Sequence, residues 1–219
     1  MADTPDTTTP ARRRRADAQR SIDAILSAAR TVLGERSDAS MEEIAAAADV
    51  TRQTVYAHFS SRDALIAAII HTAGAETLAA IDAAGLDTAP PADALRRFLD
   101  IGWDLIRRYP YLIATALTGS PPGSSDPHHA ATARLELVIR RGQRIGDFDR
   151  TLPATWLTEA VVGLARTAAE QVAAGRLTTP DAADVLFYSA LQLCGAAAPY
   201  YRTATPAAGP QADSDTDQS

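Results

Sequence analysis

Apolar residues recur at helical spacing along most of the chain, and this pattern predicts an all-α fold. Between Gln19 and Arg36 they follow one another three or four positions apart, as on one face of an amphipathic helix, which should end near Gly34. Beyond residue 75 the spacing stays helical, and prolines and glycines divide it into further segments. We expect these later helices over 94–108, 111–117, 128–142, 153–174 and 180–197.

Two short helices are expected after the first one. Ser40 and Glu43 have the spacing of a capping box, in which each side chain accepts a hydrogen bond from the other residue's backbone N–H. Asp49 interrupts this helix, and Thr51 is a suitable N-cap for another helix that extends to about Phe59. Two short helices joined by a tight turn, with a preceding helix beside them, describe a helix-turn-helix unit.

The second helix of such a unit enters the major groove of DNA, and its first residues can reach base edges. Here these residues are Arg52, Gln53 and Thr54; arginine can bond guanine and glutamine can bond adenine, each through two hydrogen bonds. The hydroxyls of Thr51 and Tyr56 suit phosphate oxygens. Short capped helices also occur in helical proteins that bind no DNA, so spacing alone favours DNA binding only modestly.

A long apolar helix is expected next, opened by Ser60 and Asp63 in the manner of a capping box. Arg62 lies at its start, close to where the flanking DNA backbone would pass. Val55 and Phe59 are four residues apart in the preceding helix and should both point into the core.

An ordered set of positions lies between about residues 18 and 70: Met41, Ile44, Ala45, Ala48, Val50, Thr51, Thr54, Tyr56, His58, Phe59, Ser61, Arg62 and Leu65. In this combination the segment resembles the DNA-binding domain of TetR-type transcriptional regulators. The chain departs from the family pattern at Asp49, where glycine is usual, although Asp tolerates a left-handed backbone better than most residues. Gln53 replaces a small residue and Arg62 replaces a frequent lysine.

The resemblance implies roles for individual residues. Backbone contacts are implied for Thr51, Tyr56, His58 and Arg62, and base readout for Arg52, Gln53 and Thr54. His58 at a helix end suits a phosphate contact, and a plain surface histidine is the next interpretation. No second ligand lies at metal-ligand spacing, so we expect no metal site.

The distribution of charge changes what the composition indicates. A net charge of -6 argues against a nucleic-acid partner, and every one of the 21 basic residues is arginine. Residues 11–36, however, hold seven arginines and three acidic residues, a local charge of +4, whereas 1–10 and 203–219 hold only acidic charges. The run of basic residues is either a solvated arm or an arm that contacts phosphates or a minor groove. It consists of Arg12, Arg13, Arg14 and Arg15.

Composition also suggests the domain limits and the compartment. We expect a disordered basic arm over 1–15, a helix-turn-helix domain over 16–70, a larger helical domain over 71–202 and a disordered acidic tail over 203–219. Cys194 is the only cysteine, which excludes an intrachain disulfide and indicates a small buried apolar side chain. No apolar run approaches the length that spans a bilayer, so we expect a cytoplasmic protein with no membrane segment.

In the C-terminal two-thirds of the chain, the sequence pattern indicates function less specifically. The last two helices are rich in alanine and other small residues, and could pack within one chain or form a symmetric four-helix interface; the TetR resemblance implies the homodimer. The resemblance also implies that the middle helices bind a small-molecule effector, although apolar residues at helical spacing are more often core. Candidate effector contacts are Trp103, Ile106, Tyr109, Tyr111, Leu112, Leu135, Ile139 and Trp156.

Catalytic and cofactor motifs are missing from the sequence. It contains no GxSxG, HExxH or glycine-rich phosphate loop and only four histidines, so we expect neither an enzyme nor a cofactor. The TetR resemblance implies a homodimeric regulator that binds double-stranded operator DNA, acts as a repressor and is released by an unknown small-molecule effector. The alternative is a helical protein with an enzymatic or partner-binding role and no operator.

Overall fold

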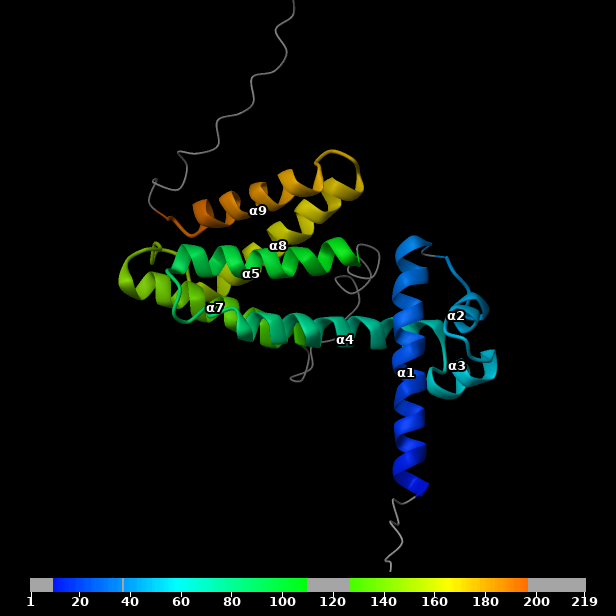
Figure 1. Cartoon of the computed structure of the whole chain (residues 1–219). Helices are drawn as coiled ribbons and strands as arrows, with labels where there is room; N and C mark the ends of the chain where they lie inside the picture. Colours follow the sequence, from blue (N-terminus) through cyan, green and yellow to red (C-terminus); the bar gives the residue numbers. More distant parts are fainter. Residues whose placement is uncertain (1–9, 37, 110–126, 197–219) are drawn as a thin grey trace, which may run out of the picture.

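The computed structural model describes residues 10–36, 38–109 and 127–196, and in these ranges the chain forms helices and no strand (Figure 1). The all-α expectation is confirmed for this part of the chain. The helices are α1 (Pro10–Glu35), α2 (Met41–Ala47), α3 (Arg52–His58), α4 (Arg62–Ala83), α5 (Pro91–Arg108), α7 (Pro127–Ile145), α8 (Ala154–Ala173) and α9 (Thr179–Leu193).

Two hydrophobic cores organise these helices. The first core lies among α1, α2, α3 and the beginning of α4, and its fully buried side chains include Ile25, Ile44 and Val55. The second core lies among the end of α4 and α5, α7, α8 and α9. Helix α4 supplies Leu65 to the first core and Ile81 to the second, so one helix joins the two domains (Figure 1). The domain boundary expected at residue 70 falls within this shared helix.

Local capping explains where the short helices begin. The capping box is confirmed: the Glu43 amide donates to the Ser40 hydroxyl at 3.2 Å, and the Ser40 amide donates to the Glu43 carboxylate at 2.7 Å. These contacts lower the pKa of Glu43 to about 2, first through the Ser40 backbone and then through the Arg36 side chain. Thr51 caps α3 by accepting from the Thr54 amide at 3.1 Å, as its sequence position predicts.

The turn between α2 and α3 uses a left-handed residue. Asp49 has φ of 54°, and it is the one residue other than glycine with positive φ among those described. The expectation that Asp49 keeps the turn in place of glycine is thus confirmed. The cap of α4 differs from the expectation, because Ser61 rather than Ser60 is the N-cap and accepts from the Ala64 amide at 3.1 Å.

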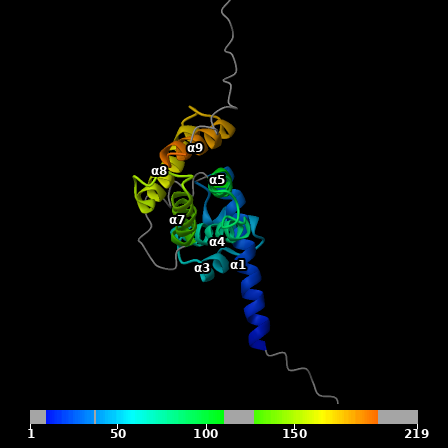
Figure 2. The same cartoon turned by 90° about the vertical axis from the view of Figure 1, so that its left-hand side faces the viewer.

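The basic segment is helical, which differs from the disordered arm expected over residues 1–15. Helix α1 begins at Pro10 and includes the whole arginine run, and its N-terminal part extends clear of the other helices in both views (Figure 1, Figure 2). The expectation is wrong for residues 10–15 because alanine and arginine are both strong helix formers and continue the helix that follows. The expected acidic tail over 203–219 lies outside the described residues.

Helix α4 corrects a second expectation. Among the described helices it is the one that is long and apolar enough, by length and composition alone, to cross a membrane. No such run was expected from the sequence. The helix packs against α1, α5 and α7 and contributes to both cores, so its apolar character fits a helix that joins two domains.

The C-terminal domain is closed by tight contacts at the end of α7. Gly142 is buried, and a Cβ atom at this position would lie 2.3 Å from the ring of Phe148. Cys194 is fully buried in the same core, and burial raises the pKa of its thiol to about 11. A thiol that stays protonated in an apolar core fits the structural role expected for it.

Candidate nucleic-acid interface

The recognition-helix candidate α3 lies at the end of the molecule away from α5, α7, α8 and α9 (Figure 1). Its Val55 is fully buried against the first core, and Phe59 just beyond it is also buried, as expected. Three of the predicted DNA contacts, Arg52, Gln53 and Tyr56, are exposed. The helix therefore has an apolar side that holds it to the domain and a polar side that faces solvent.

Arg52 is held by two neighbours rather than extending freely into solvent. Its Nη1 lies 2.5 Å from the Glu42 Oε1 on α2, and its Cζ lies 5.3 Å from the centroid of the Tyr56 ring. The side chain of Tyr56, and then the charge of Glu42, raise the pKa of Arg52. If Arg52 contacts a base, its side chain is already held by Glu42 and Tyr56 before DNA binds.

The hydroxyls of Thr51 and Thr54 lie 2.8 Å apart, and Thr51 also accepts from the Thr54 amide. One of the two hydroxyls donates to the other, so one proton of the pair remains available for an outside acceptor. Thr54 is half-buried, whereas Thr51 is exposed. This favours a backbone contact from the pair over base readout by Thr54.

The two remaining predicted contacts lie at the end of α3 and the start of α4. His58 is the last residue of α3 and is half-buried. Arg62 is also half-buried, and its Nε donates to the Ala39 carbonyl at 3.4 Å. Arg62 thus ties the start of α4 to the segment before α2, a structural role that sequence spacing did not reveal.

The predicted basic arm presents charge along the free part of α1. The side chains of Arg12, Arg14 and Arg15 are exposed, while the side chain of Arg13 lies outside the described ones. Farther along the helix, Arg20 forms an ion pair with Asp17. The N-terminal part of α1 is therefore basic, although the chain as a whole is acidic.

The effector candidates do not form one cluster. Leu135 and Ile139 are fully buried in the second core, Trp103 is 7% exposed, and Ile106 packs at the edge of that core. Trp156 is 62% exposed on α8 and so lies outside the core. Tyr109 packs against the first core, and Tyr111 and Leu112 lie outside the described residues.

Trp103 has an unusual property among the buried side chains. Its indole Nε1 is buried and has no hydrogen-bond acceptor among the described residues. A buried donor without an acceptor is energetically unfavourable and calls for an explanation. The residue before it in sequence, Gly102, has no atom within 4 Å of the position where a Cβ would lie, on a different side of α5.

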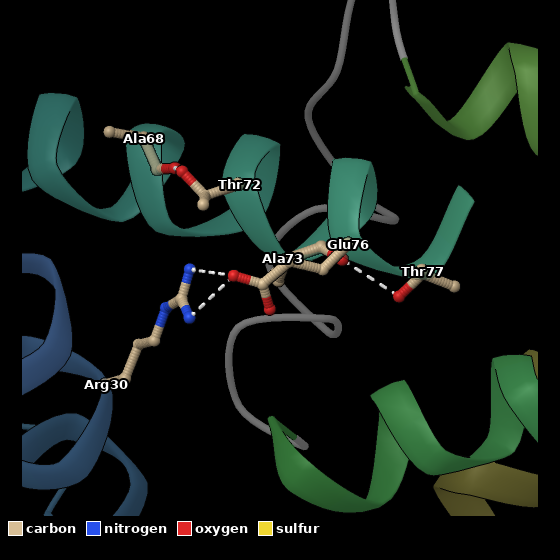
Figure 3. Close-up of polar contacts among 6 residues, drawn as sticks. All are labelled: Arg30, Ala68, Thr72, Ala73, Glu76 and Thr77. Atoms are coloured by element: carbon tan, nitrogen blue, oxygen red, sulfur yellow. Dashed lines mark hydrogen bonds and ion pairs between the residues drawn. The ribbon is translucent and has the colours of Figure 1, made fainter. Parts of the chain in front are cut away.

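An ion pair and a tight contact fix α4 to its surroundings. Both Nη atoms of Arg30 on α1 donate to one carboxylate oxygen of Glu76 on α4, at 3.0 and 3.1 Å (Figure 3). Thr77 on the same helix donates to the Ala73 carbonyl at 2.8 Å (Figure 3). A Cβ at Gly74 would lie 3.1 Å from the Cβ of Pro127, so α4 and the start of α7 touch closely here. The N-terminal domain is thus connected to α4 through this ion pair.

Helices α8 and α9 pack against each other, and each of them exposes a large apolar side chain. Trp156 is 62% exposed on α8, and Val185 is 48% exposed on α9. Gly163 lies in the interior of α8 with no atom within 4 Å of the position of a Cβ. A helix-interior glycine is destabilising relative to alanine, and nothing within the described chain requires its small size.

Sequence reasoning missed two acidic residues, Glu42 and Glu76. Each bonds an arginine that is distant in sequence, ten residues away for Glu42 and 46 for Glu76, so no local spacing rule identifies them. Among the described residues, no group of three or more His, Cys, Asp or Glu side chains is placed to hold a metal ion.

The capped α2 and α3, joined by a left-handed turn and packed on α1, define a helix-turn-helix domain. Residues 25–69 match the model of the tetR family of bacterial regulatory proteins. The N-terminal domain is therefore that of the tetR family, as the sequence resemblance predicted. No curated protein sequence matches the chain significantly.

Solved structures of TetR-like regulators are similar to this chain over about four fifths of its length. LfrR from Mycobacterium smegmatis, in complex with proflavine, is 25% identical, with 78% of this chain and 94% of that chain covered and a TM-score of 0.58. A tetR-family protein from Rhodococcus RHA1 is 21% identical, with 81% and 98% covered and a TM-score of 0.65. FadR from Bacillus subtilis, in complex with stearoyl-CoA, is 15% identical, with 78% and 96% covered and a TM-score of 0.64.

Proposed function

We propose that this chain is a cytoplasmic, homodimeric repressor that binds operator DNA through α3 and is released by a small-molecule effector. The observation that carries the DNA-binding part is the capped α2–turn–α3 unit with Asp49 in the left-handed turn. It holds Arg52, Gln53 and Tyr56 on the exposed side of α3, at the end of the molecule opposite the second core. Those side chains can bond guanine, adenine and phosphate respectively.

Charge supports DNA as the partner of this end. The exposed arginines of α1 lie on a segment with local charge of +4, and a basic patch attracts phosphates independently of base sequence. The net charge of -6 reports mostly on other segments. Affinity is therefore expected to decrease as salt rises, with a slope set by the number of phosphates contacted.

The DNA-binding proposal is tested with the purified full-length protein and a pool of randomised duplexes. Repeated selection should converge on one sequence with two related halves, and anisotropy should then give tighter binding to this duplex than to a shuffled one. Genomic footprinting with the same protein would place the selected sequence near particular genes. Equal affinity for selected and shuffled duplexes, or no binding, would contradict an operator-reading role.

Symmetry supports a homodimer through α8 and α9. Two recognition helices must lie roughly 34–36 Å apart to read successive major-groove faces, and a two-fold dimer supplies two copies of α3. The exposed Trp156 and Val185 offer apolar area, and Gly163 leaves room for a second helix to approach. Light scattering on the purified protein should give twice the chain mass, and a mass of one chain at micromolar concentration would contradict the proposal.

The buried indole of Trp103 supports an effector with a hydrogen-bond acceptor. Its Nε1 donor lacks an acceptor among the described residues. An acceptor on a bound molecule would satisfy the donor. Among solved structures with this fold, LfrR is in complex with proflavine and FadR with stearoyl-CoA, so ligand binding by such a fold has precedent.

Coupling of the effector to DNA would pass through the elements shared by the two domains. Helix α4 contributes to both cores, and Tyr109 at the end of α5, six residues after Trp103, packs against the first core. A ligand that bonds Trp103 more favourably in one position of α5 would favour that position. Through α4 and Tyr109, the change would move the first core and with it α3 in each subunit. Such an effect is limited by the ligand's difference in affinity for the two conformations.

The effector proposal is tested with proflavine and stearoyl-CoA as first probes, followed by a panel of aromatic alcohols and acids. Release of the selected duplex is measured as a function of probe concentration for the wild type and for Trp103→Phe, which keeps an aromatic ring but lacks the N–H. A true effector should need about 2- to 12-fold more compound with Trp103→Phe, the range for one lost hydrogen bond. An unchanged concentration dependence would exclude Trp103 as the donor.

A further inference from the structure

The guanidinium of Arg52 is fixed by groups from two different helices. Glu42 on α2 contacts Nη1 at 2.5 Å, and Tyr56 on α3 places its ring 5.3 Å from Cζ. The side chains of Arg52 and Glu42 are 61% and 54% exposed, so this cluster faces solvent on the side that α3 presents. An arginine in this position is already oriented before any DNA arrives.

Two features of the fold bring Glu42, Arg52 and Tyr56 together. Arg52 and Tyr56 are four residues apart on α3, which places them on one face of the helix. Glu42 reaches the same face from the first turn of α2, because the left-handed Asp49 turns the chain sharply between the two helices. Contact between residues 42 and 52 is therefore a consequence of the helix-turn-helix geometry itself.

Glu42 engages only part of the hydrogen-bonding capacity of the guanidinium. Arginine has five N–H donors in a fixed plane; Glu42 contacts it at Nη1, and the side chain of Tyr56 also interacts with it. Guanine needs two parallel donors to reach its O6 and N7 atoms, and an oriented, exposed guanidinium can supply them from its other donors. A flexible arginine, by contrast, loses side-chain freedom on bonding the base, and orienting it in advance reduces this loss.

We propose that Glu42 is a positioning residue for sequence readout: it holds Arg52 for guanine and reduces contacts with phosphates outside the operator. The proposal rests on the DNA-binding function proposed above. A guanine edge requires one orientation of the guanidinium, whereas phosphates can be reached in many orientations. Glu42 thus favours the operator over random DNA, and its negative charge adds repulsion from the DNA backbone.

The test compares the wild type with Glu42→Ala and Glu42→Gln, using full-length protein and the duplex selected by the wild type. The position read by Arg52 is found first, as the base pair whose replacement no longer weakens binding once Arg52 is alanine. Discrimination at that position is then the ratio of dissociation constants for the adenine and guanine duplexes. A shuffled duplex reports non-specific affinity, and its binding is measured over a range of salt concentrations.

Both Glu42 variants should lose discrimination and gain non-specific affinity. We expect the ratio at the Arg52 position to fall by about 3- to 10-fold, a part of what one base contact supplies. Affinity for the shuffled duplex should rise, with a salt dependence steeper by about one phosphate contact. Asp63→Asn is the matched control, because it removes an equal charge from the first turn of α4, where the described structure gives Asp63 no ion pair.

Three results separate the possibilities. Tighter binding to both duplexes with unchanged discrimination would mean that Glu42 only competes for Arg52, and would overturn the positioning role. The positioning role is also contradicted if the Glu42 variants behave like Asp63→Asn in every measurement. Failure of the wild type itself to distinguish selected from shuffled DNA would instead reject the proposed function, before the role of Glu42 is reached.

Discussion

The two domains expose opposite kinds of side chain on the faces that they do not use for their own cores. Helix α3 presents Arg52 and Gln53, polar groups whose hydrogen bonds have direction. Helices α8 and α9 present Trp156 and Val185, apolar groups that gain free energy from contact of any orientation. A directional polar surface suits recognition of base sequence, and an apolar one suits permanent association. The proposed division into DNA reading and dimerisation follows from this difference.

A charged residue on the exposed apolar side of α8 is expected to have the largest effect on DNA binding. Trp156→Glu should convert the dimer to a monomer and weaken binding to the selected duplex by about 100-fold or more, because two linked half-site contacts become one. Light scattering and anisotropy measure the two effects. Leu137→Glu is the matched control, since Leu137 is 63% exposed but lies on α7, outside the proposed interface. If both variants remain dimeric, α8 and α9 are not the interface.

Packing in the C-terminal domain is tight enough for a single methyl group to matter. Gly142→Ala should lower the free energy of unfolding by about 1–3 kcal/mol, because the new Cβ would overlap the ring of Phe148. Gly102→Ala, in open space within α5, should instead raise it by about 0.5–1 kcal/mol. Urea denaturation followed by circular dichroism gives both values. Similar effects from the two substitutions would contradict the packing described around Gly142.

In the N-terminal domain, the left-handed backbone of Asp49 carries strain that a substitution can relieve or increase. Asp49→Gly should raise the free energy of unfolding by up to about 1 kcal/mol, and Asp49→Ala should lower it by a similar amount, because only glycine adopts positive φ without strain. Thermal unfolding checks the order glycine, aspartate, alanine. Any other order would show that the Asp49 side chain contributes more than its backbone conformation.

The capping box makes a smaller, pH-dependent contribution on the same side of the molecule. The pKa of Glu43 is lowered from 4.5 to about 2, so the ionised form is stabilised by folding. This stabilisation is fully present above about pH 5 and is lost as the pH falls through 2. Glu43→Gln should therefore lower Tm slightly at pH 7, because the carboxylate is exposed and its charge is screened by solvent, and the gap from wild type should close as the pH approaches 2. A gap that is constant from pH 7 to pH 2 would contradict the role of the charge.

Most local features of the N-terminal domain could be predicted from its sequence. Ser40, Glu43, Asp49 and Thr51 act over three or four residues, and the structure confirms the cap or turn inferred at each of them. The helical start of α1 could not be predicted in this way. The run of arginines indicates a solvated arm, but alanine and arginine are strong helix formers, and α1 begins at Pro10.

The candidate site was predictable only in part. Exposure of Arg52, Gln53 and Tyr56 follows from their position in a short amphipathic helix, so sequence spacing was sufficient for them. The tether from Arg62 to Ala39 and the contact between Glu42 and Arg52 depend on how helices cross in space, which no spacing rule supplies. In the C-terminal domain, helical spacing could not distinguish the buried Leu135 from the exposed Trp156, because both lie in alanine-rich amphipathic segments.

Reading of DNA by α3 is tested most directly by one anisotropy experiment with the selected and shuffled duplexes. Arg52→Ala should weaken binding to the selected duplex by about 5- to 150-fold, the range for one lost two-bond base contact, and change the shuffled duplex much less. Arg140→Ala on α7, an exposed arginine in the other domain, should leave both affinities unchanged. Equal losses on the two duplexes for Arg52→Ala, or a loss no greater than that of Arg140→Ala, would contradict sequence readout by this helix.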